Sequence, residues 1–213
     1  MSGETLEYHY GAAGATWANH YLWPVLGREI EARRRAAAVR QTVFDLGCGN
    51  GATCHYLHSL GFAVTFVDLS ESGICIAKTS YPECRFEIGS AYDDLAAKYG
   101  RFPLVVSLEV VEHCYDPRKF AGRLFDLVEP GGTAFVSTPY HGYLKNVALA
   151  VTGKLDQHFT VLWDGGHVKF FSIRTLGLLL AEAGFRDIQF VRVGRVPAFA
   201  KSMVAIARRP EQS

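Results

Sequence analysis

Residues 43–52, VFDLGCGNGA, lead from a short apolar run into three glycines at alternate positions. Gly47, Gly49 and Gly51 have no Cβ, so the backbone there can come close to a ligand. A strand that ends in a glycine-rich turn and continues into a helix is typical of doubly wound α/β folds, which bind ligands at that turn. The stretch therefore predicts both a fold class and the place of a binding site.

The chain continues as an alternation of short apolar runs and helix-length segments. The runs that predict buried strands are TVFDL, AVTFVDL, CRFEI, PLVVSL and TAFVST. The segments between most of them are residues 51–60, 70–80, 91–99 and 116–128. Strands that alternate with helices pair in parallel through right-handed crossovers, which predicts a Rossmann-like α/β sheet. A turn at Pro130–Gly132 should lead into the fifth strand.

The two ends of the chain and one internal segment depart from this alternation. Residues 16–39 have a helical pattern, which we expect to break near Trp23-Pro24 because proline disrupts a helix interior. Runs at 186–193 and 202–207 should form a final strand pair. We expect one domain in four parts: an N-terminal helical segment (1–40), a cofactor-binding core (41–139), a substrate-lid insert (140–169), and a C-terminal helix with the strand pair (170–213).

Composition limits the classes of function. The chain has 213 residues, 22 of them basic and 21 acidic, and its net charge of +1 does not favour nucleic acid as a partner. Five cysteines without a C-x-x-C pair fit a reducing compartment better than a disulfide framework. The N-terminus lacks the apolar core of a signal peptide, and no apolar run reaches the roughly 20 residues that span a bilayer. A cytoplasmic protein is expected.

Two acidic residues indicate which ligand the glycine turn holds. Asp45 precedes the glycines, and Asp68 ends the second strand at a spacing suited to a ribose diol. A carboxylate such as Asp45 would repel a pyrophosphate but attract an ammonium or sulfonium group. S-adenosylmethionine combines a ribose, an adenine and a cationic amino-acid end. A turn without a ligand would not explain both acids, and a nicotinamide oxidoreductase is a more distant alternative.

Four motifs in order make the chain similar to class I S-adenosylmethionine-dependent methyltransferases. They are VFDLGCGNGA, FVDLS, VVSLEVVEHCYDP and LVEPGGTAFVSTP. The resemblance implies a seven-stranded sheet whose last strand is antiparallel. It also implies cofactor-binding residues: Asp45, Gly47, Cys48 and Gly49 around the methionine part, Asp68 on the ribose, Leu69, Ser90 and Ala91 around adenine, and Glu109 near the cofactor. Many members have an acid where this chain has Ser90, and Asp93 or Asp94 can compensate.

The segment Glu109-Val-Val-Glu112-His113 follows the fourth strand at the ligand-facing edge. A helical turn there would place Glu109, Glu112 and His113 on one face, where they can bind Mg²⁺, Mn²⁺ or Zn²⁺. Alternatively, His113 acts alone as a base oriented by Glu112. A third interpretation is a loop with no catalytic role. Spacing alone leaves these three open.

Within the broad family the chain most resembles ubiquinone-biosynthesis O-methyltransferases, which share the E-x-x-E-H arrangement. This resemblance implies O-methylation of a phenolic or hydroxylated small molecule, assisted by a metal. Metal-free N-, C- or sugar-O-methyl transfer remains an alternative, as does a non-catalytic protein that binds S-adenosylmethionine. The oligomeric state is left open.

Aromatic residues in the N-terminal segment and in the insert predict a lid over a flat or apolar acceptor. They are Tyr8, Tyr10, Trp17, Tyr21, Trp23, Tyr140, Tyr143, Phe159 and Trp163, and about half should serve only packing. Two histidines flank the insert, and we rank His167 second to His113 as a base, with His141 behind. Lys145 and Lys154 bracket an apolar stretch that can form an ordinary lid helix or make weak contact with a membrane surface.

Overall fold

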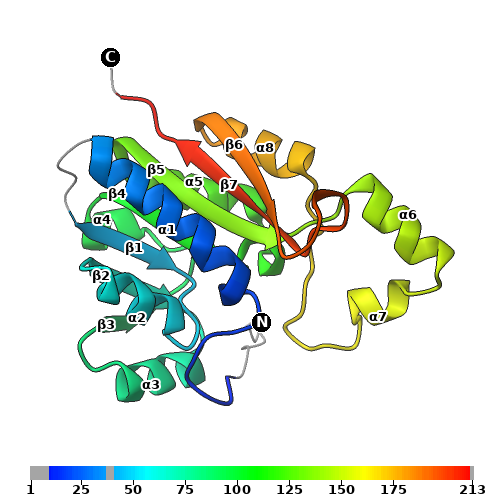
Figure 1. Cartoon of the computed structure of the whole chain (residues 1–213). Coiled ribbons are helices and arrows are strands. Elements are labelled where there is room, and N and C mark those ends of the chain that lie inside the picture. The colour runs from blue at the N-terminus through cyan, green and yellow to red at the C-terminus, as the bar shows by residue number, and fades with distance from the viewer. Residues whose placement is uncertain (1–9, 37–40, 212–213) are drawn as a thin grey trace.

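The strand β1 (Thr42–Leu46) that precedes the glycine turn lies between β2 (Ala63–Asp68) and β4 (Phe102–Leu108) in a seven-stranded sheet. The computed structural model, shown in Figure 1, describes residues 10–36 and 41–211. The strand order is β3-β2-β1-β4-β5-β7-β6. The remaining strands are β3 (Arg85–Ile88), β5 (Val128–Pro139), β6 (Arg186–Val193) and β7 (Ser202–Arg208).

Strand direction confirms the predicted Rossmann-like sheet. β1 to β5 pair in parallel, and in the described chain β7 alone runs antiparallel to both of its neighbours, β5 and β6. Strand order reverses between β1 and β4, so the carboxyl ends of these two strands flank a switch point where such sheets bind ligands.

Helices cover both faces of the sheet (Figure 1). Alternate residues of β1 point to opposite faces: Val43 packs with α1 (Asn19–Ala36) and α2 (Ala52–Ser59), whereas Phe44 packs with the helices of the other face. α3 (Glu71–Ser80) packs on the face that carries α2. The helices of the other face are α4 (Leu95–Tyr99), α5 (Pro117–Leu127) and α8 (Ile173–Glu182).

Two local expectations were wrong. α1 runs without a break through Pro24. The proline removes only one backbone hydrogen bond, the one to the carbonyl of His20, and His20 is exposed. Burial of Leu22, Val25 and Leu26 against the sheet stabilises the helix in spite of that loss. The Pro130–Gly132 turn is absorbed into β5 as a bulge, with Phe102 opposite Val128 and Leu104 opposite Thr133. The predicted end of the first helix at Val39 lies outside the described residues.

The segment after β5 forms two short helices, α6 (Tyr143–Val151) and α7 (Leu155–Phe159), which project from the body of the molecule beside the β6–β7 connection (Figure 1). An extended stretch then returns to α8 along the carboxyl edge of the sheet. α6 contacts η2 (Pro197–Phe199), a short turn within the β6–β7 connection. Among the described helices, none has both the length and the hydropathy needed to cross a membrane.

Candidate active site

A cleft of about 840 Å³ opens at the carboxyl ends of β1, β2 and β4. All nine residues that the sequence assigned to the cofactor line it: Asp45, Gly47, Cys48, Gly49, Asp68, Leu69, Ser90, Ala91 and Glu109. His113 and His167 line the same cleft, together with aromatic residues from the N-terminal segment and the insert. One continuous space therefore joins the glycine turn to the candidate catalytic side chains.

Backbone conformation and close neighbours exclude a Cβ at all three glycines of the turn, as Gly47 and Gly49 illustrate. Gly47 has φ 86° and Gly49 has φ 54°, both in the left-handed region. A Cβ on Gly47 would overlap the side chain of Val110, and one on Gly49 would overlap the ring of Tyr10. The backbone N–H of Gly47 donates to the carbonyl of Val67 at 2.8 Å, which ties the turn to the end of β2.

Asp68 is held at the end of β2 by two backbone groups. Its Oδ2 accepts from the N–H of Gly49 at 2.7 Å, and its Oδ1 accepts from the N–H of Ser70 at 2.7 Å. The side chain is partly exposed to the cleft. Leu69 next to it is 43% exposed, which leaves an apolar face free to pack against a flat ring.

Asp45 lies deeper than the sequence suggested. We expected it at the mouth of the turn, but its side chain is only 1% exposed because it projects from the central strand β1. Cys54 donates a weak S–H bond to its Oδ2 at 3.6 Å. Burial, with the nearby Asp68 adding to it, raises the pKa of Asp45 to about 7. A cationic group at the floor of the cleft would favour its charged form.

Ser90 and its acidic neighbours bind mainly to their own loop. The Ser90 hydroxyl accepts from the N–H of Tyr92 at 3.1 Å, and Asp93 accepts from the N–H of Ser90 at 2.8 Å. Asp94 caps α4 through the N–H of Ala97. The two candidate replacements for the missing family acid are therefore engaged in local structure, and Ser90 itself remains on the cleft wall.

Glu109 does not share a helical face with Glu112 and His113. The helical turn η1 (Val111–His113) begins two residues later, and Glu109 has φ 56°, so the chain changes direction there. Its Oε1 accepts from the Ser137 hydroxyl at 2.7 Å, and its Oε2 accepts from the Ser202 hydroxyl at 3.1 Å. Burial raises the pKa of Glu109 to about 7. These bonds fix the carboxyl group to β5 and β7.

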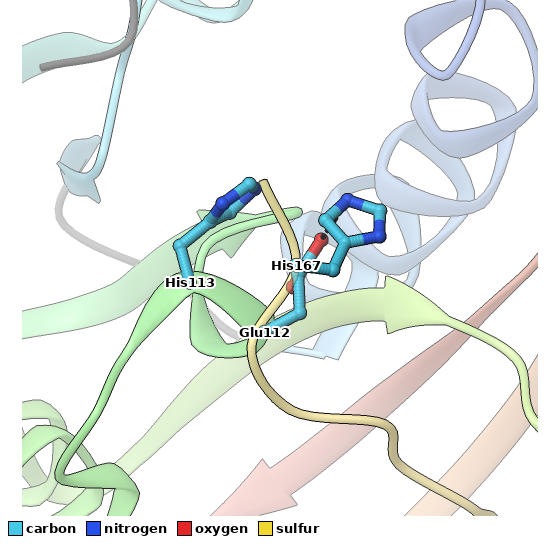
Figure 2. A group of neighbouring side chains, drawn as sticks. All are labelled: Glu112, His113 and His167. Atoms are coloured by element: carbon cyan, nitrogen blue, oxygen red, sulfur yellow. Dashed lines mark ion pairs between the residues drawn. The ribbon is translucent and has the colours of Figure 1, made fainter. Parts of the chain in front are cut away.

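The structure instead brings Glu112 and His113 together with His167 (Figure 2). Glu112 is 1% exposed, and neither carboxylate oxygen has a hydrogen-bond partner among the described residues. Oε1 lies 3.9 Å from Nε2 of His167. Burial, and secondarily Glu109, raises the pKa of Glu112 well above its ordinary value. The nearby Thr138 hydroxyl is buried and also has no hydrogen-bond partner in the part of the chain that the structure describes.

His113 is oriented by the returning segment of the insert. Its Nδ1 lies 2.9 Å from the Gly165 carbonyl and 3.1 Å from that of Gly166, and because carbonyls only accept, Nδ1 carries the proton. Nε2 is then left with a free lone pair. The N–H groups of Val168 and Lys169 donate to the backbone carbonyl of Glu112 at 2.9 Å. These four bonds dock residues 165–169 onto η1.

Burial also sets the charge of the two histidines. It lowers the pKa of His113, and it lowers the pKa of His167 to about 4, with the neighbouring His113 adding to the effect. The two rings meet edge to face with centroids 4.9 Å apart. At neutral pH both imidazoles are therefore neutral, which is the form that can accept a proton or bind a metal.

Within the described residues, the predicted lid aromatics divide into three groups. Tyr10, Phe159 and Trp163 line the cleft, whereas Trp17 is 84% and Tyr143 81% exposed. The side chains that pack elsewhere are Tyr21, Trp23 and Tyr140. His141 is buried against His158 and two phenylalanines and lies outside the cleft lining, which argues against a role as base. Tyr8 lies outside the described residues.

Sequence reasoning missed one residue that shapes the cleft. Asn50 donates through its side-chain amide to the carbonyls of Ala12 at 2.9 Å and Gly14 at 3.0 Å, and so fastens the N-terminal segment against the glycine turn. An amide side chain placed between two glycines of a binding motif was a signal for such a role. Its partners could not be identified, because they come from an irregular segment.

Comparisons with known proteins agree with this arrangement. A family model described as "Methyltransferase domain" matches residues 19–189. Ubiquinone biosynthesis O-methyltransferase from Caulobacter vibrioides is 38% identical over 126 residues, which cover 57% of this chain and 48% of that protein. The protein of the same name from Thiobacillus denitrificans is 32% identical over 171 residues, which cover 78% of this chain and 72% of that protein.

The matched region spans about half the length of several of these curated relatives. A solved structure of magnesium protoporphyrin IX methyltransferase from Synechocystis PCC 6803 with bound SAH superposes with a TM-score of 0.68. The superposition covers 94% of this chain and 90% of that one at 18% sequence identity. This likeness concerns the fold.

Proposed function

The chain belongs to the family of methyltransferase domains, and from this premise we propose that it moves the methyl group of S-adenosylmethionine to an oxygen atom of a small hydroxylated aromatic acceptor. The observation that carries the proposal is the one cleft that joins the glycine turn and Asp68 to His113 and His167. Oxygen is favoured as the acceptor atom because the similar curated proteins are named for O-methylation.

The cofactor would lie along the carboxyl edge of the sheet. The backbone at Gly47 and Gly49, with Asp45 beneath it, suits the ammonium end of the methionine part. Asp68, whose carboxylate oxygens accept from the N–H groups of Gly49 and Ser70 and which lines the cleft, would accept from the ribose diol. Leu69 would pack on adenine, near Ser90. The sulfonium would then face the half of the cleft that holds His113 and His167.

Methyl transfer is an in-line displacement in which the acceptor oxygen forms a bond to the methyl carbon as the carbon–sulfur bond breaks. The sulfonium leaves as a neutral thioether, and the hydroxyl proton must pass to a base. Nε2 of His113 can take it, because donation from Nδ1 to Gly165 and Gly166 fixes the tautomer. The docked segment 165–169 and Trp163 would exclude water from that proton.

A divalent metal fits the same group of side chains. The ligand atoms of Glu112, His113 and His167 all lie within 4.8 Å of one another, and the carboxylate has no hydrogen-bond partner among the described residues. Two imidazoles and one carboxylate suit Zn²⁺, Mn²⁺ or Fe²⁺ better than Mg²⁺, which prefers oxygen ligands. A metal bound there would supply Lewis acidity that lowers the pKa of an acceptor hydroxyl.

Metal-free transfer is the second candidate, because the neutral imidazole that could bind a metal could equally take the acceptor proton. Burial lowers the pKa of His113 and lowers that of His167 to about 4, so both rings are unprotonated at neutral pH, and His113 keeps the more basic nitrogen. His113 would then serve as base, with Glu112 and His167 as positioning residues. The same cofactor site would also serve nitrogen or carbon acceptors.

The insert supports an apolar acceptor. Phe159, Trp163 and Phe170 line the cleft on the insert side. α6 has no buried residue and exposes Tyr143, Leu144, Val147 and Val151, which suits weak contact with a membrane surface where an apolar phenol would be dissolved. An aromatic ring carrying a hydroxyl group and an apolar side chain is the acceptor class that these features suit.

The test uses cofactor labelled in its methyl group, offered with catechols that carry apolar side chains of increasing length. Mass spectrometry should show the label on one oxygen of the acceptor. The variant Asp68→Asn should lose S-adenosylhomocysteine binding and product together. Tight cofactor binding with no label in any acceptor would indicate a non-catalytic binding protein, and tight NAD binding in place of S-adenosylhomocysteine would overturn the proposal.

A further inference from the structure

A second cavity of about 320 Å³ lies outside the cleft, between the insert and the β6–β7 connection. Lys145, Ala148, Leu149 and Thr152 contribute one face of α6, since their spacing places them on successive turns. The rest of the lining is His158 from α7 and Arg195, Phe199, Ala200 and Lys201 from the β6–β7 connection. The cavity is within the size range of small-ligand sites.

The lining carries positive charge without acidic residues. Of the described residues that line the cavity, Lys145, Arg195 and Lys201 are basic and none is acidic. None of these three takes part in an ion pair within the described chain. Lys201 already faces an aromatic ring, since its ammonium lies 5.7 Å from the centre of the Tyr21 ring. We therefore assign the ligand to the other two cations, Lys145 and Arg195.

Lys145 is held in place before any ligand arrives. Its Nζ donates to the backbone carbonyl of Tyr140 at 2.8 Å and lies 3.5 Å from that of Lys201. Burial, and then repulsion from Arg195, lowers the pKa of Lys145 to about 8, while Glu109 acts in the opposite direction. Two neighbouring cations without an acidic partner repel each other, and an anion between them would convert that repulsion into attraction.

His158 adds a further unsatisfied group. Its Nε2 is buried and has no hydrogen-bond partner among the described residues, and its pKa is lowered by burial and then by Lys145. Buried polar atoms normally have a partner, so an unpartnered one beside a cavity indicates a missing ligand or water. An oxygen-rich anion would provide acceptors for Lys145, Arg195 and an N–H of His158 together.

We propose that this cavity binds the phosphoryl group of a phosphate ester or diphosphate. A doubly charged oxyanion matches two cations and one imidazole better than a carboxylate does. The volume leaves room for an organic group beside the phosphoryl oxygens. Occupation would tie α6 to the β6–β7 connection and thereby hold the insert, whose later residues Phe159 to Phe170 wall the cleft.

The test measures pyrophosphate binding by calorimetry at low ionic strength. Arg195→Gln is the informative variant, because the exposed side chain makes no hydrogen bond or ion pair within the described chain and its loss should leave the fold intact. We expect about tenfold weaker binding in Arg195→Gln and in Lys145→Gln. Arg174→Gln on α8, also exposed and outside both cavities, is the control and should bind as the unaltered protein does.

A second arm identifies the source of the phosphoryl group. Vesicles of phosphatidic acid, a phosphate monoester, and of phosphatidylcholine are sedimented with the protein, with and without pyrophosphate. Retention on phosphatidic acid that falls in Arg195→Gln indicates a lipid headgroup; pyrophosphate binding without retention indicates a soluble ester. Equal behaviour of the variant and the control in both arms would refute the site. S-adenosylhomocysteine affinity, which Arg195→Gln should not alter, tests the proposed function separately.

Discussion

Nε2 of His167 lies 3.9 Å from Oε1 of Glu112, although His167 belongs to the segment after α7 and Glu112 to the turn after β4. Burial disfavours the charged form of each: it raises the pKa of Glu112 well above its ordinary value and lowers that of His167 to about 4. Burial therefore favours a carboxylic acid facing a neutral imidazole over a charged ion pair. A metal ion entering there would displace the carboxyl proton.

The first prediction concerns the proton that a metal ion would displace from the Glu112 carboxyl group. Binding of Mn²⁺ or Zn²⁺ should release up to about one proton and should strengthen as pH rises, because the carboxylate form of Glu112 is the ligand and burial raises the pKa of that carboxyl group. Calorimetry in two buffers of different ionisation enthalpy measures the release. Glu112→Gln should bind at least about tenfold more weakly and release no proton. Affinity that is independent of pH and unchanged by the substitution would exclude this metal site.

The second prediction separates the two ring nitrogens of His113. Asparagine places a donor near Nδ1, whereas glutamine places a polar atom near Nε2. His113→Asn should keep the bond to Gly165 and the docked segment but lose methyl transfer by about 10²–10⁴-fold, since the base or ligand at Nε2 is gone. Single-turnover rates measure that loss, and protease susceptibility of residues 160–169 reports docking.

His113→Gln is the matched comparison for that experiment. It removes the donor at the position of Nδ1, so residues 160–169 should become more susceptible to protease whether or not residual methyl transfer remains. If His113→Asn kept full activity, His113 would be neither base nor ligand. The remaining candidate base in the cleft would then be His167.

Much of the fold was predictable because its signals are local. The strand TVFDL, the glycines that follow it and Asp68 depend on short-range periodicity and on backbone conformations that few residues allow. The cofactor half of the cleft is built from these loops at strand ends. All nine predicted residues line the cleft, since parallel strands bring their carboxyl ends to one edge.

The catalytic half was less predictable because long-range packing decides it. A helical face through Glu109, Glu112 and His113 required regular backbone, but Ser137 and Ser202 capture Glu109 from two other strands and its φ is positive. The meeting of His167 with Glu112 depends on how the insert returns to η1, which has no periodic signal. Histidine at the end of an insert was a clue, but its partner was not identifiable.

The third prediction concerns the close approach of backbone at Gly47. Gly47 has φ +86° and Gly153 has φ +64°, so alanine costs backbone strain of about 1–2 kcal/mol at either position. Of these two positions, only at Gly47 would the new Cβ overlap a neighbour, Val110, whereas around Gly153 the space within 4 Å is open. Gly47→Ala should therefore lose roughly 1–3 kcal/mol more stability than Gly153→Ala. Urea unfolding measures both.

Cofactor affinity distinguishes the two glycine variants further. Gly47→Ala should abolish S-adenosylhomocysteine binding because Val110 and Gly47 both line the cleft, while Gly153→Ala, outside the cleft lining, should bind normally. Comparable stability and affinity in the two variants would show that the close approach at Gly47 is not required.

The last prediction rests on the buried Asp45 carboxyl. Its pKa is about 7 in the folded chain, against about 3.9 in an unfolded chain, so the folded state holds its proton more strongly. This contribution to stability is complete below pH 4 and is lost as pH rises to 7. Asp45→Asn, which has no proton to lose, should gain stability relative to the unaltered protein between pH 5 and 8. The full difference has an upper limit of about 4 kcal/mol.

Urea unfolding of both proteins at intervals of one pH unit gives this difference in stability. The raised pKa of Glu109 also makes stability depend on pH, but it does so equally in both proteins and drops out of the difference. Cofactor affinity should depend on pH in the opposite direction to stability. A sulfonium or ammonium group near Asp45 favours the carboxylate, so affinity for S-adenosylmethionine should rise through pH 7 in the unaltered protein and stay level in Asp45→Asn. Parallel stability curves would mean that Asp45 is already ionised in the folded chain, and the electrostatic argument for a cationic ligand at its side chain would then lose its basis.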